Sequence, residues 1–367
     1  MELNWTELTK GISLLFLLLN IAFLAFYYKK NFVVNKGTKI RFGQLVLSIV
    51  LIVIVSASSG SDWFSYQQVV WNYDFSNGAI NYGEPVYGYI AKLTNRNYLL
   101  FRLIVWGGAF LIALQTFKRL RININMAAYL LIAIFLLRFN YARASLGMAL
   151  YFLGLSFMIN PNKKKINGGV IVSLLMFYIA YCFHHSMIVL TMLTPLILLP
   201  LDKKGLLAII IVFLPVLAYI MQSNLNIVDA LNIDYLSDKM EIYVDREGEQ
   251  RSFFGQLANV LLYGAFYVPI AIDIYVYLKY KKSVDRTMVL LFRLLMIITL
   301  FSFSFLFMGF KSAVFFCRFL YMTMIPIVVI TVYFYSNGLM SKRQYKAILL
   351  WGITAVSFDL FHMYYIL

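Results

Sequence analysis

The sequence has few charged residues, few acidic residues in particular, and almost no cysteine. Charged residues make up 13% of its 367 positions, and 32 lysines and arginines outnumber 16 aspartates and glutamates. The 2 cysteines, Cys182 and Cys317, both lie in apolar runs, which excludes a disulfide framework and a cysteine-ligated zinc site. Because 62% of the residues are hydrophobic, a soluble globular protein is excluded too. The composition therefore predicts an all-α polytopic membrane protein.

The net charge of +16 suggests a nucleic-acid-binding protein until the basic residues are located along the chain. They occur in short blocks between apolar runs, and only Asp202 and Asp285 accompany them. The positive-inside rule assigns every block to the cytoplasm, so we expect no nucleic-acid partner. The blocks lie at 29–41, 118–121, 163–165, 203–204, 279–286 and 342–346.

A segment between two neighbouring blocks must cross the membrane an even number of times, because both of its ends are cytoplasmic. At roughly 20 residues per span, this gives about twelve transmembrane helices with both termini outside. We expect residues 1–367 to form a single transmembrane domain. Its spans are predicted at 11–28, 43–58, 98–117, 123–139, 142–159, 167–183, 186–201, 205–222, 254–278, 288–308, 313–335 and 347–365.

Two long segments are expected outside the membrane. The first outer loop, 59–97, is rich in aromatic residues and contains glycines and a proline, so it is expected to lie in the interface or partly to re-enter the protein. The second outer loop, 223–253, carries apolar residues at helical spacing among many acidic ones. We expect an amphipathic helix there, lying over the outer face.

Three predicted hairpins bring cations to the outer side, against the positive-inside rule. The stretch between Arg121 and Lys163 has one polar place to turn, at 138–143, and the stretch between Lys165 and Lys203 has one at 183–186. A third turn is expected near 309–312, with Arg318 about two helical turns, or roughly 10 Å, below its tip. The residues placed there are Arg138, Arg143, His184, His185, Lys311 and Arg318.

These outer cations admit two interpretations. Each alone could extend from a helix end toward the head groups. An arginine facing lipid costs about 2.5 to 3.5 kcal/mol, however, so a group of them favours a site for an anion such as phosphate or pyrophosphate. Asp62 and Glu84 could pair with these arginines, or act as a general base or a sugar-hydroxyl acceptor. Trp63 and Tyr66 could stack on sugar faces or belong to an interfacial aromatic belt.

Five short motifs in order give the chain a recognisable pattern. The motifs are Gly60-Ser61-Asp62-Trp63-Phe64-Ser65-Tyr66, Glu84-Pro85-Val86-Tyr87, Arg143-Ala144-Ser145-Leu146-Gly147, Phe183-His184-His185-Ser186 and Arg318-Phe319-Leu320-Tyr321. Together they resemble the EpsG-like family of Wzy-type bacterial polysaccharide polymerases, which make O-antigen, capsule or exopolysaccharide. Ser61, Trp63 and Ala144 depart from the family pattern.

The resemblance implies a fold related to the C-type membrane glycosyltransferases and a substrate of undecaprenyl-pyrophosphate-linked oligosaccharides. The enzyme would lie in the bacterial plasma membrane, with its active site on the outer, periplasmic face. A chain-length regulator and a flippase are possible partners besides the lipid bilayer.

Pyrophosphate is already a good leaving group, so this reaction needs positive charge and a base rather than an acid. We expect Arg143 and Arg318, supported by Arg138 and Lys311, to bind the pyrophosphate, while the candidates for the base are His184, Asp62 and Glu84, in that order. No cofactor and no metal are expected, since arginines can neutralise the charge. Direct displacement would invert the anomeric centre.

Three alternatives remain open from the sequence. A lipid-linked oligosaccharide flippase or exporter suits about twelve helices, although ionisable groups should then line the midplane. An O-antigen ligase has almost the same chemistry and differs in the acceptor. A membrane O-acyltransferase has only His184 in its favour.

Overall fold

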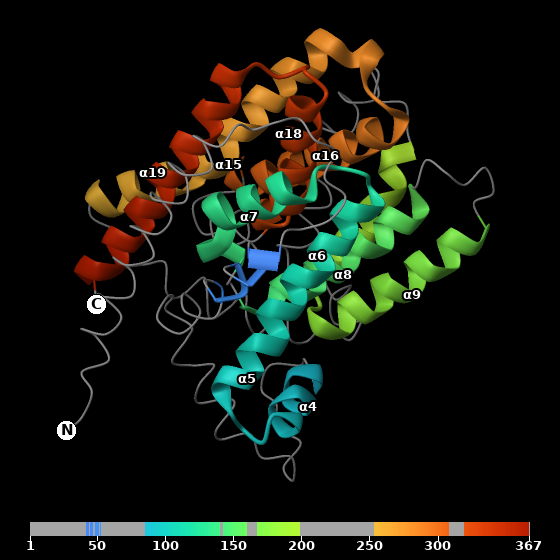
Figure 1. Cartoon of the computed structure of the whole chain (residues 1–367), viewed down its shortest axis with the longest axis vertical. Helices are drawn as coiled ribbons and strands as arrows, with labels where there is room; N and C mark the ends of the chain where they lie inside the picture. The colour runs from blue at the N-terminus through green and yellow to red at the C-terminus, as the bar shows by residue number, and fades with distance from the viewer. Residues whose placement is uncertain are drawn as a thin grey trace.

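The protein is a bundle of helices (Figure 1). The computed structural model describes residues 42–43, 45–46, 48–50, 52, 85–139, 142–159, 167–198, 253–307 and 319–366. No strand occurs in these ranges, so the all-α prediction is confirmed for them. The elements are α4 (Pro85–Leu93), α5 (Tyr98–Arg102), the π-helical turn η1 (Leu103–Gly107), α6 (Gly108–Arg119), α7 (Ile124–Phe139), α8 (Ala142–Met158), α9 (Asn167–Phe183), α10 (Met187–Leu193), the 3₁₀ turn η2 (Thr194–Leu198), α15 (Phe253–Tyr280), η4 (Lys281–Ser283), α16 (Arg286–Phe307), α18 (Met324–Ser336) and α19 (Lys342–Ile366).

Three stretches of the described chain are long and apolar enough to cross a membrane. They are Leu100–Arg119, Arg286–Ser304 and Phe319–Ser336, at three of the predicted spans. Four shorter apolar helices, Ile124–Phe135, Ala144–Met158, Gly169–Phe183 and Met187–Leu198, lie at four more. The chain is therefore a helical membrane protein, while the total of about twelve spans stays a prediction.

One face of α9 supports a membrane location. Ile171, Leu174, Leu175 and Tyr178 recur at helical spacing and are all exposed, with Ile171 exposed by 70%. Soluble proteins seldom leave such an apolar stripe open, whereas lipid covers it at no cost. The opposite face of α9, which carries Phe177 and Ala180, is buried.

Small residues bring α8 and α9 into close contact. The Ser173 hydroxyl lies 2.7 Å from the carbonyl oxygens of both Gly154 and Gly169. A Cβ built on Gly154 would lie 2.8 Å from the Cβ of Met176, so no larger residue fits between the two helices there. Small residues allow such close approach of membrane helices, where there is no hydrophobic drive to associate.

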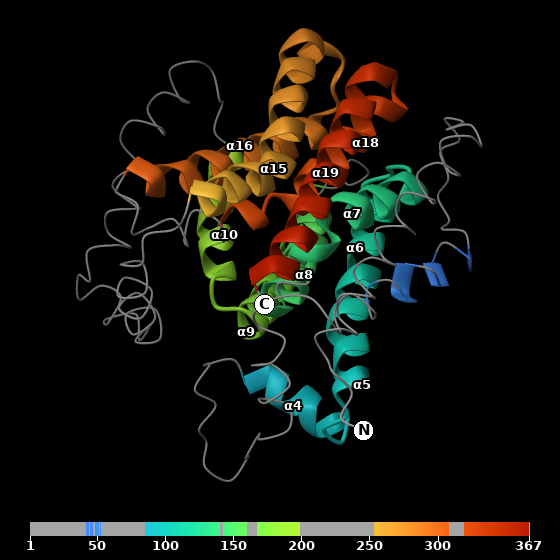
Figure 2. The same ribbon diagram turned by 90° about the vertical axis from the view of Figure 1, so that its left-hand side faces the viewer.

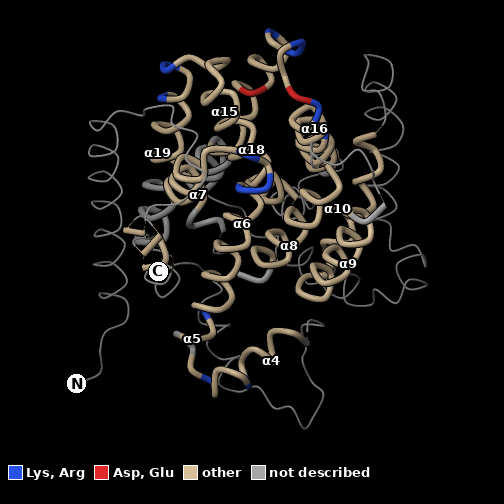
Figure 3. Tube along the Cα trace, turned by 45° about the vertical axis from the view of Figure 1, so that its right-hand side comes forward, with Lys and Arg blue, Asp and Glu red and all other residues tan. Residues whose placement is uncertain are grey.

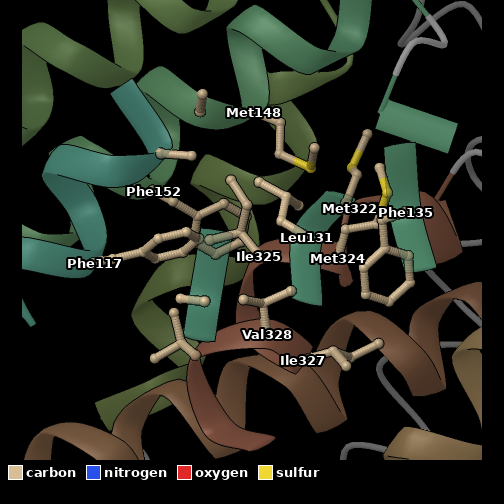
Figure 4. Close-up of a cluster of buried hydrophobic side chains, with 14 of the residues drawn as sticks. Phe117, Leu131, Phe135, Met148, Phe152, Met322, Met324, Ile325, Ile327 and Val328 are labelled. Carbon is tan, nitrogen blue, oxygen red and sulfur yellow. The ribbon is translucent and has the colours of Figure 1, made fainter. Parts of the chain in front are cut away.

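The core lies between α6, α7, α8 and α18. Phe117, Leu131, Phe152 and Val328 come from these four helices and meet in one buried cluster (Figure 4). Truncation of a side chain of this size in such a core costs about 2 to 5 kcal/mol. This packing fixes α8, whose N-terminal end carries one of the five motifs.

Polar side chains also connect helices of the bundle. The Thr287 hydroxyl donates to the carbonyl oxygen of Ile159, and an Nη1–H of Arg293 donates to that of Ile197, so α16 satisfies carbonyls at the C-terminal ends of α8 and η2. Asp273 of α15 is fully buried and accepts a 2.9 Å hydrogen bond from the Thr331 hydroxyl of α18. These residues hold helices together and lie away from the outer motifs.

The basic segments of the α15–α16 and α18–α19 connections lie at one end of the bundle, and α4 and α5 lie at the opposite end (Figure 3). This separation is what the predicted topology requires of two cytoplasmic blocks and the first outer loop. Which end faces the cytoplasm stays a prediction.

The two long outer loops are described only in part. Within 59–97 the structure shows the helix α4, which lies below α9 in Figure 2. Residues 223–252, with the predicted amphipathic helix, lie outside the described residues. The single-domain organisation and both loop assignments stay predictions.

Candidate active site

The turn between α9 and α10 carries His184. Helix α9 ends at Phe183 and α10 begins at Met187, so the predicted turn at 183–186 is confirmed. The His184 N–H donates to the Ala180 carbonyl oxygen at 2.9 Å, and the Met187 N–H donates to the His184 carbonyl oxygen at 2.9 Å. Backbone hydrogen bonds on both sides therefore hold the backbone of His184 in place within the turn.

His184 lies against α8 at a glycine. A Cβ built on Gly147 would lie 3.2 Å from the Cβ of His184 and 3.1 Å from the Ala180 carbonyl oxygen. Arg143 precedes Gly147 by four positions in α8, so the backbones of the two residues lie about 6 Å apart along the helix axis. The structure thus brings the backbone of Arg143 to within about one helical turn of the His184 turn.

The α7–α8 turn is where the sequence predicts it. Helix α7 ends at Phe139 and α8 begins at Ala142, which confirms the expected break between two helices within 138–143. Arg138 and Arg143 therefore belong to the last turn of one helix and the first turn of the next. Both cations lie at the same end of the bundle as His184.

A third motif reaches this place through α4. Pro85 begins α4, a position where its missing N–H has no cost. The Tyr87 ring lies edge-on to the Phe183 ring, with centroids 5.9 Å apart, and 6.3 Å from the Phe101 ring. Glu84 lies outside the described residues but directly precedes this helix.

Three of the five motifs therefore meet around the α9–α10 turn. Tyr87 contacts Phe183, and Gly147 contacts His184. Two neighbours complete the turn: His185 stacks on Tyr181 with centroids 4.8 Å apart, and the buried Ser186 hydroxyl has no hydrogen-bond partner in the described part of the chain.

The other candidate residues fall partly inside and partly outside the described ranges. The structure gives backbone positions for Arg138 and Arg143. The motifs around Asp62 and Arg318 contribute no described site residue. Outside the described residues lie Asp62, Trp63, Tyr66, Glu84, Lys311 and Arg318.

The structure also places a buried cation that the sequence analysis did not single out. Arg102 ends α5 and is only 5% exposed, with its guanidinium carbon 5.9 Å from the Trp106 ring centroid. Directly after it comes the π-helical turn η1, a rare element that is frequent at functional sites. The sequence contains a feature that could have identified it, because Arg102 is a cation near the outer end of the predicted span 98–117.

The described residues contain no cluster of three or more His, Cys, Asp or Glu side chains that could hold a metal ion. Asp62 and Glu84 are not among these residues, so metal independence stays a prediction.

The fold and this site define an all-helical membrane protein with cations and a histidine gathered at one end of its bundle. A family model for the EpsG family matches residues 39–367, and the chain therefore belongs to the EpsG family. Membership indicates a polysaccharide-polymerase-like function of the glycosyltransferase type. No curated protein and no solved structure matches the chain.

Proposed function

We propose that the protein joins undecaprenyl-pyrophosphate-linked oligosaccharide repeat units at the outer face of the bacterial plasma membrane. It transfers a growing glycan from its lipid carrier to the non-reducing end of a second lipid-linked unit. The product is a polysaccharide of the O-antigen, capsule or exopolysaccharide kind. A fold related to the C-type membrane glycosyltransferases is part of this proposal.

The observation that carries the proposal is the contact of His184 with α8 at Gly147, four positions after Arg143 in the same helix. A transferase of this type needs a base for the acceptor hydroxyl and positive charge for the departing anion, close together. The contact at Gly147 puts a candidate for each on adjoining segments. Tyr87, which follows the candidate base Glu84 by three positions in the sequence, packs on Phe183 beside the His184 turn.

The chemistry is a single displacement. The base, His184 in our assignment, takes the proton of the acceptor hydroxyl while its oxygen attacks the anomeric carbon of the donor. The bond from that carbon to the pyrophosphate oxygen breaks, and undecaprenyl pyrophosphate leaves with the electron pair. The configuration at the anomeric carbon is inverted, and Arg143, Arg318, Arg138 and Lys311 stabilise the charge that develops.

The remaining parts of the proposal concern the sugars and the partners. Trp63 and Tyr66 are proposed to stack on the glycan, since aromatic rings suit the apolar faces of sugars. A flippase that supplies the repeat unit and a chain-length regulator are the proposed protein partners. No metal or other cofactor is required, because guanidinium groups offer bidentate donors to phosphate.

The test is an assay of the purified full-length protein with purified lipid-linked repeat unit. A ladder of products of increasing length supports a polymerase. A single transfer to another acceptor indicates an O-antigen ligase, and the absence of any new glycosidic bond favours a flippase or exporter. The His184→Ala protein, reconstituted at the same density, is the control for background transfer.

A further inference from the structure

We propose that Arg102 and Trp106 form a further part of the anion site and donate hydrogen bonds to the pyrophosphate oxygens of the lipid-linked substrate. This rests on the proposed function, because it names additional residues for the same substrate. It is carried by the burial of both side chains, by their position along the bundle and by the indole N–H of Trp106.

Both side chains face the interior of the bundle. Arg102 is 5% exposed and Trp106 is 3% exposed, whereas Leu103 and Ile104 between them are exposed by 41% and 40%. The buried side of residues 102–106 packs on α8, which contacts both η1 and α6. The two side chains thus lie on the protein-facing side, away from the side that the exposed leucine and isoleucine present to lipid.

The register of α6 against α8 places this pair at the level of Arg143. The Nε–H of Arg119 donates to the Ser156 hydroxyl at 3.1 Å, which fixes the two helices at one end. Helix α8 also contacts η1, which precedes α6, so α6 and α8 run in the same direction. Trp106 stands thirteen positions before Arg119, and Arg143 stands thirteen positions before Ser156. At 1.5 Å per residue, Trp106 lies at about the level of Arg143, and Arg102 lies about one turn further out.

The two side chains supply a charge and a donor in one place. The guanidinium carbon of Arg102 lies 5.9 Å from the centre of the Trp106 ring, within the range of a cation–π contact. The buried indole N–H of Trp106 has no acceptor among the described residues. A buried N–H without an acceptor is destabilising, so this indole is suited to an acceptor that arrives with a ligand.

An arginine buried in a membrane protein is expensive and is by default a functional residue. Here it stands beside an indole donor and at the start of a π-helical turn. Phosphate oxygens are the acceptors that fit, because they are anionic and accept from both groups at once. The anion site then extends from the α7–α8 turn to the end of α5.

The test measures binding of undecaprenyl pyrophosphate to the full-length protein in lipid nanodiscs. Arg102→Gln should weaken binding about tenfold or more, and Trp106→Phe, which keeps a ring and loses the N–H, about three- to tenfold. Lys92→Gln changes an exposed cation on α4, and Trp351→Phe changes a tryptophan on α19, so neither should alter binding. Undecaprenol, which lacks phosphate, should bind all variants like the wild type.

Unchanged affinity of both site variants for undecaprenyl pyrophosphate overturns the proposal, as does an equal loss of affinity for undecaprenol. If Arg102→Gln does not accumulate, Trp106→Phe decides, because it keeps an aromatic ring and removes no charge. A wrong assignment of Arg102 and Trp106 can be distinguished from a wrong proposed function. A wild-type protein that makes a product ladder, with site variants that bind normally, overturns only the role of Arg102 and Trp106.

Discussion

Gly147 of α8 touches His184 so closely that a methyl group at position 147 would lie 3.2 Å from the His184 Cβ. The same methyl group would lie 3.1 Å from the backbone oxygen of Ala180, which does not yield as a flexible side chain does. The position of the proposed base therefore depends on the absence of a side chain at Gly147.

Replacement of Gly147 by alanine should lower polymer formation about three- to tenfold with little loss of protein. The added methyl must shift the α9–α10 turn by a few tenths of an ångström, and catalytic rates are sensitive to such shifts. Polymer yield per unit of membrane protein is the measurement. Gly108→Ala is the matched control, because a Cβ at Gly108 meets nothing within 4 Å. Equal yields from the two variants would contradict the role of this contact.

Alanine at Arg143 or at Arg318 should lower polymer formation by about 10² or more. Removal of one electrostatic stabiliser of a transition state commonly costs about 3 to 4 kcal/mol. Protein abundance should persist in both variants, since neither residue is assigned to packing. Polymer of normal length and amount in both would end the assignment of the pyrophosphate to these arginines.

Activity should be undiminished in excess chelator. In the proposed mechanism the arginines supply the positive charge that Mg²⁺ or Mn²⁺ would otherwise provide. The measurement is the product ladder of the purified protein after dialysis against a chelator. A loss of activity that Mg²⁺ restores would instead make Asp62 and Glu84 metal ligands.

The sequence predicts the turns of this protein better than its helix contacts. Residues 138–143 and 183–186 are polar interruptions of long apolar stretches, so a reversal could occur nowhere else without burying polar groups. The sequence does not indicate which faces of the helices pack together, because α7 and α8 are apolar all round and have no amphipathic stripe. The contact of Gly147 with His184 is therefore visible only in the structure.

Arg102 shows a second limit of sequence reasoning. A single cation hardly changes the hydropathy of a span such as Leu100–Arg119, and Arg102 does not lie at the tip of a predicted hairpin. Burial depends on which side of α5 packs on the bundle, and that is decided by contacts with distant segments. The same holds for α4, which forms inside a segment predicted as a loop, where Pro85 was a signal for a helix start.

The identity of the base can be tested by the pH dependence of single-turnover transfer. An imidazole base in general loses activity as the pH falls below about 6.5, because it becomes protonated, whereas a carboxylate base stays active down to about pH 4 to 5. With His184 as the base, His184→Ala should lower the rate about 10² or more and change the shape of the pH profile. Asp62→Asn and Glu84→Gln should retain the wild-type profile.

A His184→Ala protein with near-normal rate, alongside an inactive Asp62→Asn protein, would make Asp62 the base. His184 would then serve through its contact with α8 at Gly147 alone.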